Sequence, residues 1–302
     1  GIAQRRIGRV VLALLCLGGG VLAAAIATGE KAGGGYVVGA KSFTEQYILS
    51  ALMAARIEAE GAPVTRRVGL GSSIAFTALE NGEIDAYVDY SGTIWANVMR
   101  RTDAPPRQDI LSEAGNWLRR EHGVTLLGAL GFENAYALAM RRDRALALGI
   151  RTIADLARVA PQLRMGGDFE FFGRPEWTSL SERYGLAFAS RRQFQSTFMY
   201  SAVVDGEVDV ISAFSSDGRI VADDLVVLED PLGAILPYDA IVLLAPGRGD
   251  DPLLRRALEP LLNAIQVESM REASYRVDRE QDKSSAIAAA HWLEGKIGLS
   301  AP

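Results

Sequence analysis

Residues 78–85 read Ala-Leu-Glu-Asn-Gly-Glu-Ile-Asp, and residues 202–209, 124 positions further along, read Ala-Val-Val-Asp-Gly-Glu-Val-Asp. The flanks agree in register, because a predicted helix precedes each copy and a strand ending in an aromatic residue, Tyr90 or Phe214, follows it. Recurrence at a fixed spacing is typical of a duplicated unit, whereas the alternative is a common helix-to-strand turn that recurs by chance. The repeat therefore predicts two lobes built on one plan, with Tyr90 and Phe214 facing each other across a cleft.

Short apolar strands alternate with amphipathic helices through most of the chain, which predicts α/β lobes with mostly parallel sheets. The first unit begins with an apolar strand over residues 36–39. Ser42 and Glu45 then have the spacing of a capping box at the start of a helix. Lys41 is therefore expected at a strand-to-helix turn, and ligands of open α/β sheets bind at the carboxyl ends of the strands.

Two extended segments, residues 131–140 and 236–244, are predicted to cross between the lobes, and they carry Tyr136 and Tyr238. The tail, residues 252–297, is mostly helical in pattern and is expected to cover the first lobe. We expect lobe 1 to comprise residues 35–135 and 239–302, and lobe 2 to comprise residues 136–238.

The first 34 residues have the pattern of a targeting segment. A basic stretch to Arg9 precedes an apolar run from Val10 to Ala27 that ends in small residues. About 18 apolar residues suit either a cleaved signal peptide or a retained membrane anchor. Both alternatives predict that the folded part is periplasmic or otherwise extracytoplasmic. Because the chain begins with Gly1, a fragment of a longer protein, fused to a permease, is a further expectation.

Composition excludes several classes of function. The 302 residues include a single Cys and carry a net charge of −5. One Cys cannot form a disulfide framework or a Cys-based zinc site, and an acidic body without a basic stripe argues against nucleic-acid binding. His122 and His291 have no evident metal-ligand or nucleophile partner, and no phosphate-binding loop is present. We therefore expect no catalytic residues, no metal, no cofactor and no enzymatic activity.

Aromatic residues gather at the predicted strand ends and crossings. Several ring faces around one point bind a quaternary ammonium group through cation–π attraction. The alternative is that these rings belong to the hydrophobic core. The residues are Tyr90, Tyr136, Phe214 and Tyr238.

Three segments carry a family resemblance. They are residues 38–46 (Val-Gly-Ala-Lys-Ser-Phe-Thr-Glu-Gln), residues 82–93 (Gly-Glu-Ile-Asp-Ala-Tyr-Val-Asp-Tyr-Ser-Gly-Thr) and residues 212–220 (Ser-Ala-Phe-Ser-Ser-Asp-Gly-Arg-Ile). From Tyr36 onward the chain resembles the glycine betaine/carnitine/choline-binding proteins of osmoprotectant ABC transporters. The resemblance implies an α/β, two-lobed periplasmic-binding-protein fold of the second type, with the ligand cleft between the lobes. It also implies an extracytoplasmic substrate-binding protein that takes glycine betaine or a related quaternary ammonium zwitterion and delivers it to a membrane permease.

The resemblance further implies which residues bind the ligand. It assigns an aromatic cage to Tyr90, Tyr136, Phe214 and Tyr238, with Phe214 standing where the family usually has Tyr. It places Lys41, Thr93 and Arg174 around the ligand carboxylate, with Asn134 as a polar contact nearby.

Two buried cations without an anion would be unpaired and costly, which favours a ligand with a carboxylate over choline. Choline, carnitine or a larger trimethylated amino acid such as ergothioneine remain alternatives, as does a ligand-sensing domain. We expect a monomer.

Overall fold

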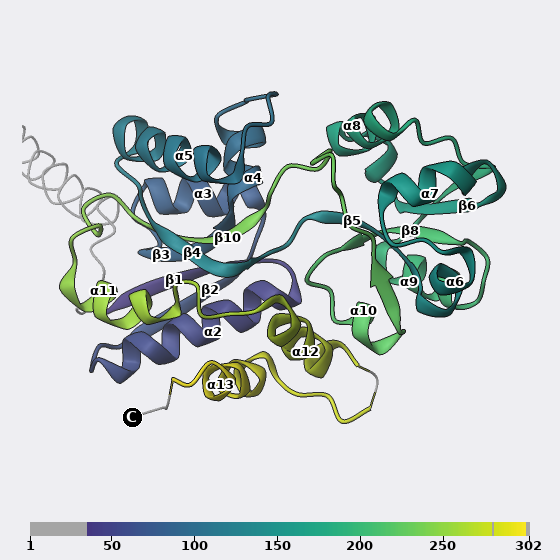
Figure 1. The fold of residues 1–302 in the computed structure, drawn as a ribbon. Coiled ribbons are helices and arrows are strands. Elements are labelled where there is room, and N and C mark those ends of the chain that lie inside the picture. Colours follow the sequence, from purple (N-terminus) through teal and green to yellow (C-terminus); the bar gives the residue numbers. More distant parts are fainter. Residues whose placement is uncertain (1–34, 280, 300–302) are drawn as a thin grey trace, which may run out of the picture. The chain divides into compact units, whose positions relative to one another are not determined.

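The computed structural model describes residues 35–279 and 281–299 (Figure 1). The predicted targeting segment, residues 1–34, lies outside the described residues. Among the helices of the described ranges, none has both the length and the apolar composition that crossing a bilayer requires.

The first lobe is built on a five-stranded sheet with the order β2-β1-β3-β10-β4. Within it β1 runs parallel to β2 and β3, whereas β10 runs antiparallel to β3 and β4. Its strands are β1 (Tyr36–Lys41), β2 (Val64–Leu70), β3 (Ala86–Tyr90), β4 (Thr125–Glu133) and β10 (Asp239–Leu244).

The second lobe is built on a five-stranded sheet with the order β7-β6-β8-β5-β9. Here β6 runs parallel to β7 and β8, and β5 runs antiparallel to β8 and β9. Its strands are β5 (Tyr136–Arg141), β6 (Arg164–Asp168), β7 (Ser190–Phe194), β8 (Val210–Phe214) and β9 (Leu225–Val227).

The two sheets share a pairing pattern that confirms the predicted duplication. β1 lies between β2 and β3 as β6 lies between β7 and β8. The last Asp of each repeated stretch binds the backbone of the neighbouring strand. The Asp85 carboxylate accepts a hydrogen bond from the Val37 amide at 2.7 Å. In the second lobe, the Asp209 carboxylate accepts one from the Arg164 amide at 2.9 Å. The repeat is therefore structural, and Tyr90 and Phe214 end equivalent strands.

Helices cover both faces of each sheet, which gives each lobe three layers with apolar cores between them (Figure 1). The first lobe contains α2 (Thr44–Ala59), α3 (Ser72–Glu80), α4 (Ser91–Thr93), which continues as a π-helix (Ile94–Val98), and α5 (Arg107–His122). The second lobe contains α6 (Arg142–Leu148), α7 (Ile153–Val159), α8 (Pro175–Tyr184), α9 (Ser196–Val204) and α10 (Arg219–Ala222).

The tail is helical and packs on α2 of the first lobe, as predicted. It consists of α11 (Pro252–Leu258), α12 (Val267–Asp278) and α13 (Ala286–Lys296). α12 also contacts α10 of the second lobe, which was not expected. Short 3₁₀ turns occupy Ala160–Gln162, Phe171–Gly173 and Glu259–Leu261.

The chain passes between the sheets twice, after β4 and after β9. The first crossing is short, since β5 begins three residues after Glu133. The predicted lobe boundaries, at residues 135/136 and 238/239, fall in these connections and stay predictions.

The predicted capping box at Ser42 and Glu45 is wrong. α2 begins at Thr44, and its cap residue is Phe43, which makes no side-chain capping hydrogen bond. The Phe43 carbonyl instead accepts hydrogen bonds from the amides of Gln46 and Tyr47. The Glu45 side chain is used elsewhere, because its carboxyl accepts hydrogen bonds from Tyr90 and Asn134.

Candidate ligand-binding site

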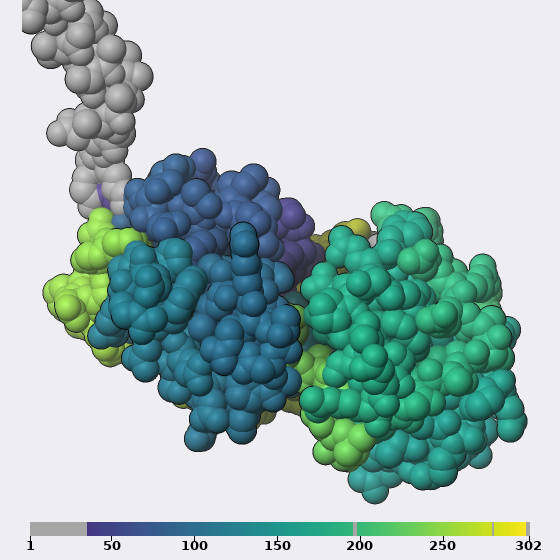
Figure 2. Space-filling model, turned by 90° about the horizontal axis from the view of Figure 1, so that it is seen from above, coloured from purple at the N-terminus to yellow at the C-terminus, as the bar shows by residue number. Residues whose placement is uncertain are grey.

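A cavity of about 190 Å³ is lined by all eight residues that the sequence predicted to contact a ligand. They lie at the ends of strands, at the starts of helices and in the crossings, and they are Lys41, Tyr90, Thr93, Asn134, Tyr136, Arg174, Phe214 and Tyr238. Phe43 and Ser72 also line the cavity and were missed. Both lobes contribute walls, and Figure 2 shows a hollow between the two masses. The cavity is small beside the roughly 300–1,000 Å³ of pockets for drug-sized ligands, which fits a compact solute.

Hydrogen bonds at the phenol oxygens hold two of the four predicted cage rings, Tyr90 and Tyr238. Tyr90 donates its hydroxyl to Glu45 and accepts a hydrogen bond from Gln46 at 3.0 Å, while Tyr238 donates to Glu176 Oε1 at 2.7 Å. Burial, followed by the nearby carboxylates, raises the pKa of both phenols above the usual range. The rings therefore stay neutral.

Two further rings lie side by side at the second-lobe wall. The centroids of Tyr136 and Phe214 are 4.9 Å apart, at an interplanar angle of 38°. Burial is the main cause of the raised pKa of Tyr136. On the first-lobe side, Phe43 stacks on Tyr90 with centroids 6.2 Å apart. The site thus offers two groups of ring faces, one from each lobe.

Lys41 and Arg174 are both paired with carboxylates, so the expectation that they would be unpaired without a ligand anion is wrong. Lys41 is 3% exposed and forms a salt bridge with Asp89, a residue of the neighbouring strand β3. Arg174 contacts Glu176 and Glu170, each at 3.2 Å. Each cation therefore has a carboxylate partner within the chain.

Each cation also lies over a ring of the cage. The Lys41 Nζ is 5.2 Å from the centroid of the Tyr90 ring, and the Arg174 guanidinium carbon is 5.2 Å from that of Tyr136. Cations and ring faces are therefore adjacent on both walls, so a short ligand can reach both kinds of group.

Glu45 contacts two residues of the cavity lining, Tyr90 and Asn134. Burial raises the pKa of its carboxyl to about 7, although hydrogen bonds with the side chains of Ser216, Tyr90 and Asn134 act to lower this pKa. One carboxyl oxygen, Oε2, makes no hydrogen bond within the described residues. Sequence reasoning missed this role because it explained Glu45 as a helix cap.

A match to a known family shows where the chain belongs. A family model described as the substrate binding domain of ABC-type glycine betaine transport systems matches residues 35–295. The chain belongs to this family.

The relatives of this substrate-binding domain are named after different ligands. The ergothioneine transport permease/ergothioneine binding protein EgtU of Helicobacter pylori is 30% identical over 268 residues, which cover 87% of this chain and 48% of that protein. The glycine-betaine-binding protein of Pseudomonas aeruginosa is 30% identical over 292 residues, covering 91% of both chains. The chain thus spans about half of the first relative and most of the second.

Solved structures support the two-lobed binding-protein fold. The crystal structure of a glycine betaine/carnitine/choline ABC transporter protein matches with a TM-score of 0.81 and 26% identity, covering 87% of this chain and 99% of that one. Ligand-free YehZ of Escherichia coli matches with a TM-score of 0.76 at 20% identity, covering 88% of this chain and 99% of that one. The predicted fold class is confirmed.

Within the described part of this substrate-binding domain, no cluster of three or more His, Cys, Asp and Glu side chains is arranged to hold a metal ion. His122 lies 2.7 Å from Glu80 and packs against Trp117, and His291 is exposed. Neither lines the cavity.

Proposed function

We propose that the chain captures glycine betaine, or a closely related quaternary ammonium zwitterion, in the cavity lined by both lobes. The observation that carries the proposal is that four aromatic rings and two cations line one small cavity. Family membership supports it, because the family model describes glycine betaine transport systems.

The chemistry of the lining suits the two ends of such a ligand. Ring faces attract a trimethylammonium group, and charge-assisted N–H donors bind a carboxylate. Lysine has three donors and arginine five, so Lys41 and Arg174 keep free donors after bonding to their carboxylate partners.

The balance of charge in the site favours a zwitterion over choline. Lys41 with Asp89 and Arg174 with Glu176 form two ion pairs of zero net charge, and Glu170, the other partner of Arg174, is exposed to solvent, which screens its charge. A neutral zwitterion leaves this balance intact and uses the free donors, whereas choline adds a positive charge and brings no carboxylate.

The wider role follows from the family. We infer that the chain works outside the cytoplasm, has no catalytic activity of its own, and passes its ligand to the membrane permease of an ABC importer. One relative, EgtU, is named as both permease and binding protein, so a permease on the same polypeptide is an alternative to a separate one. A monomer without nucleic acid remains our expectation.

Calorimetric titration tests the ligand. The chain is unfolded and refolded to remove any bound solute, then titrated with glycine betaine and with choline under identical conditions. We expect glycine betaine to bind more tightly than choline. Tighter choline binding would contradict the zwitterion proposal, and failure of both to bind would direct the search to carnitine and larger trimethylated amino acids.

Two substitutions test the cage. Tyr90→Ala and Tyr238→Ala should each weaken glycine betaine binding by about 1–2 kcal/mol, because each removes one ring face from the ammonium group. Phe198→Ala, which removes an aromatic ring that is 63% exposed on α9, is the matched control and should leave the affinity unchanged. Unchanged affinity in both Tyr variants would mean that these rings serve only the core.

A further inference from the structure

Helices α3 and α9, one in each lobe, expose a large apolar side chain at the same position. Both helices have nine residues, and they begin 124 positions apart, which is the spacing of the repeat. The third residue is Ile74 in α3 and Phe198 in α9, and these side chains are 60% and 63% exposed. One exposed apolar residue is common on a protein surface, but the same exposure in both copies of one position indicates a shared use.

Other exposed apolar side chains lie at the same end of each sheet. Ile74 and Phe198 follow the edge strands β2 and β7. Val68 of β2 is exposed, and so is Phe169, which comes directly after β6. The Gln193 side chain of β7 donates a hydrogen bond to the Phe169 carbonyl at 2.9 Å. All four apolar residues therefore lie toward the carboxyl ends of parallel strands, the end at which the ligand cavity also lies.

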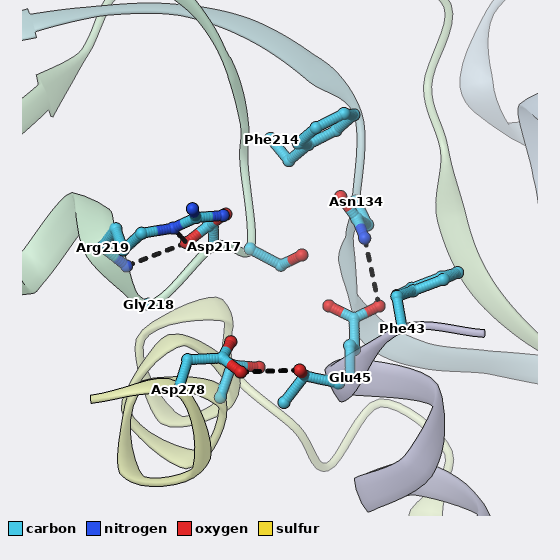
Figure 3. A pocket seen from close by; sticks show the side chains of 11 residues that line it. Phe43, Glu45, Asn134, Phe214, Asp217, Gly218, Arg219 and Asp278 are labelled. Atoms are coloured by element: carbon cyan, nitrogen blue, oxygen red, sulfur yellow. Dashed lines mark hydrogen bonds and ion pairs between the residues drawn. The ribbon is translucent and has the colours of Figure 1, made fainter. Parts of the chain in front are cut away.

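Both helices contact the ligand site. Ser72, the first residue of α3, lines the ligand cavity. In the second lobe, the Tyr200 hydroxyl of α9 accepts a hydrogen bond from the Phe214 amide at 3.2 Å. Phe214 lines the ligand cavity and also an adjoining cavity of about 350 Å³ with walls from both lobes (Figure 3). A protein that binds to α3 and α9 therefore lies beside the groups that surround the ligand.

The edge strands next to these helices carry a duplicated pair of arginines, residues 66–67 in β2 and 191–192 in β7. The second arginine of each pair forms an exposed ion pair, with Glu83 in one lobe and Glu207 in the other. The first arginine has no carboxylate partner within the described residues: in β2 it donates to a backbone carbonyl, and in β7 it lies over aromatic rings. Each lobe thus adds a positive charge beside its exposed apolar residues, on a chain with a net charge of −5.

We propose that α3 and α9, with the edge strands β2 and β7, form a two-part docking surface for the permease of the ABC importer. Apolar side chains of the permease pack on Ile74 and Phe198, and its carboxylates pair with Arg66 and Arg191. The surface has one part in each lobe and lies beside the cavity from which the permease receives the ligand. This inference rests on the proposed function, because the permease is the partner inferred there.

The charges favour the permease over two other occupants. A segment that binds anionic lipid carries about four to eight clustered basic residues, whereas each lobe here adds one arginine without a carboxylate partner. A second copy of the chain, docked through the same surface, would bring Arg66 or Arg191 against a like charge, which opposes association. A partner with apolar and acidic side chains meets neither objection.

Uptake by intact cells tests the surface with the native permease. Cells of the source organism carry Ile74→Asp or Phe198→Asp in the chromosomal gene, and the uptake of radiolabelled glycine betaine is measured. Each substitution puts a charge into an apolar contact and should lower uptake about tenfold. Calorimetric titration of the purified variants should give the wild-type affinity for glycine betaine. Wild-type uptake in both variants would overturn the inference, and so would a loss of affinity that accounts for the loss of uptake.

Leu146→Asp is the matched control. Leu146 is 75% exposed on α6, which follows β5. Because β5 runs antiparallel to β8, α6 lies at the opposite end of the second-lobe sheet from α9. The control introduces the same charge on the same lobe, so its uptake should equal that of the wild type. A loss as large as that of Phe198→Asp would contradict a docking surface at α9.

Two measurements on the purified chain examine the other occupants. Sedimentation velocity reports self-association, and co-sedimentation with phosphatidylglycerol vesicles reports membrane binding. We expect Ile74→Asp and Phe198→Asp to change neither. A dimer, or a vesicle-bound form, that both substitutions abolish would assign the surface to a second copy or to lipid and overturn the proposal.

Deletion of the gene separates this inference from the proposed function. If deletion lowers glycine betaine uptake while both variants keep wild-type uptake, only the docking surface is wrong. If deletion leaves uptake unchanged, the proposed role in glycine betaine transport fails, and the docking surface that rests on it fails as well.

Discussion

At the scale of single residues, Gly92 shows how tightly the cage is built. It follows β3 within α4, and a Cβ atom there would lie 2.8 Å from three carbons of the Tyr238 ring. That distance is shorter than a van der Waals contact, so any side chain would displace the ring. The sequence run 82–93 contains this glycine, but a sequence alone does not show what packs against it.

Gly92→Ala should weaken glycine betaine binding by about 0.5–2 kcal/mol, because it displaces one ring face of the cage. Calorimetric titration measures the loss. The control is Gly295→Ala, an exposed glycine of α13 where a Cβ meets nothing within 4 Å, and its affinity should match that of the wild type. Equal affinities of Gly92→Ala and the control would show that Tyr238 does not contact the ligand.

Glu45 should make stability depend on pH. Burial raises the pKa of its carboxyl from 4.5 to about 7, with the nearby charge of Asp217 contributing in the same direction. Between these values the folded chain holds a proton that the unfolded chain has lost, so the free energy of unfolding falls as pH rises. Below pH 4.5 both states are protonated and the free energy of unfolding has its highest value, whereas above about pH 7 both states are ionised and the loss is complete.

The pH dependence is checked by urea unfolding of the wild type and of Glu45→Gln, whose side chain cannot ionise, across a series of pH values. From pH 4 to pH 8 the wild type should lose about 3 kcal/mol of unfolding free energy relative to the variant. Parallel curves for the two proteins would contradict the raised pKa.

The residues that the sequence predicted and those it missed differ in a physical way. Tyr90 and Phe214 could be predicted because the repeat places them at equivalent strand ends. The partners of the cations, Asp89 and Glu176, could not, because pairing depends on which strands and helices become neighbours. Glu45 was misassigned for the same reason.

At the scale of elements, the salt bridge between Lys41 and Asp89 joins β1 to β3. These strands pair in parallel, and the bridge lies at their carboxyl ends. Asp89 also accepts hydrogen bonds from the Tyr87 hydroxyl at 2.5 Å and the Tyr90 amide at 2.7 Å. The pair therefore fixes the strand ends that carry the first-lobe part of the cage.

Lys41→Met should lower the free energy of unfolding by about 3–5 kcal/mol, because it leaves the Asp89 carboxylate buried without its cation. The double variant Lys41→Met/Asp89→Asn should recover most of the loss, since the amide oxygen still accepts hydrogen bonds. Urea unfolding at constant pH measures both. Arg67→Met, which breaks an exposed ion pair with Glu83, is the control and should cost about 1 kcal/mol or less. A double variant as unstable as the single one would contradict the pairing argument.

The arrangement of elements could largely be predicted from the sequence. The repeat follows from the recurrence of one stretch 124 residues along the chain, and the helical tail follows from hydrophobic periodicity. The contact between α12 and α10 could not be predicted, because it depends on a close approach: a Cβ at Gly218 would lie 2.5 Å from the Tyr275 amide nitrogen. Such a contact produces no periodic pattern of residues in the sequence.

At the scale of the whole folded part, the cavity walls belong to both lobes, and the two crossings and the contact of α12 with α10 are among the links that join them. A ligand that contacts both walls binds best to the state in which they are close. We therefore expect binding to shift the population toward that closed state by the difference in affinity for the two states.

Small-angle X-ray scattering tests this coupling. Saturating glycine betaine should lower the radius of gyration of the chain, because the closed state is more compact. Arg174→Ala removes a donor of the second lobe, so at equal saturation the decrease should be smaller, since binding then relies more on the first-lobe wall. An unchanged radius of gyration in the wild type, at a glycine betaine concentration that calorimetry shows to be saturating, would mean that the ligand binds without drawing the lobes together.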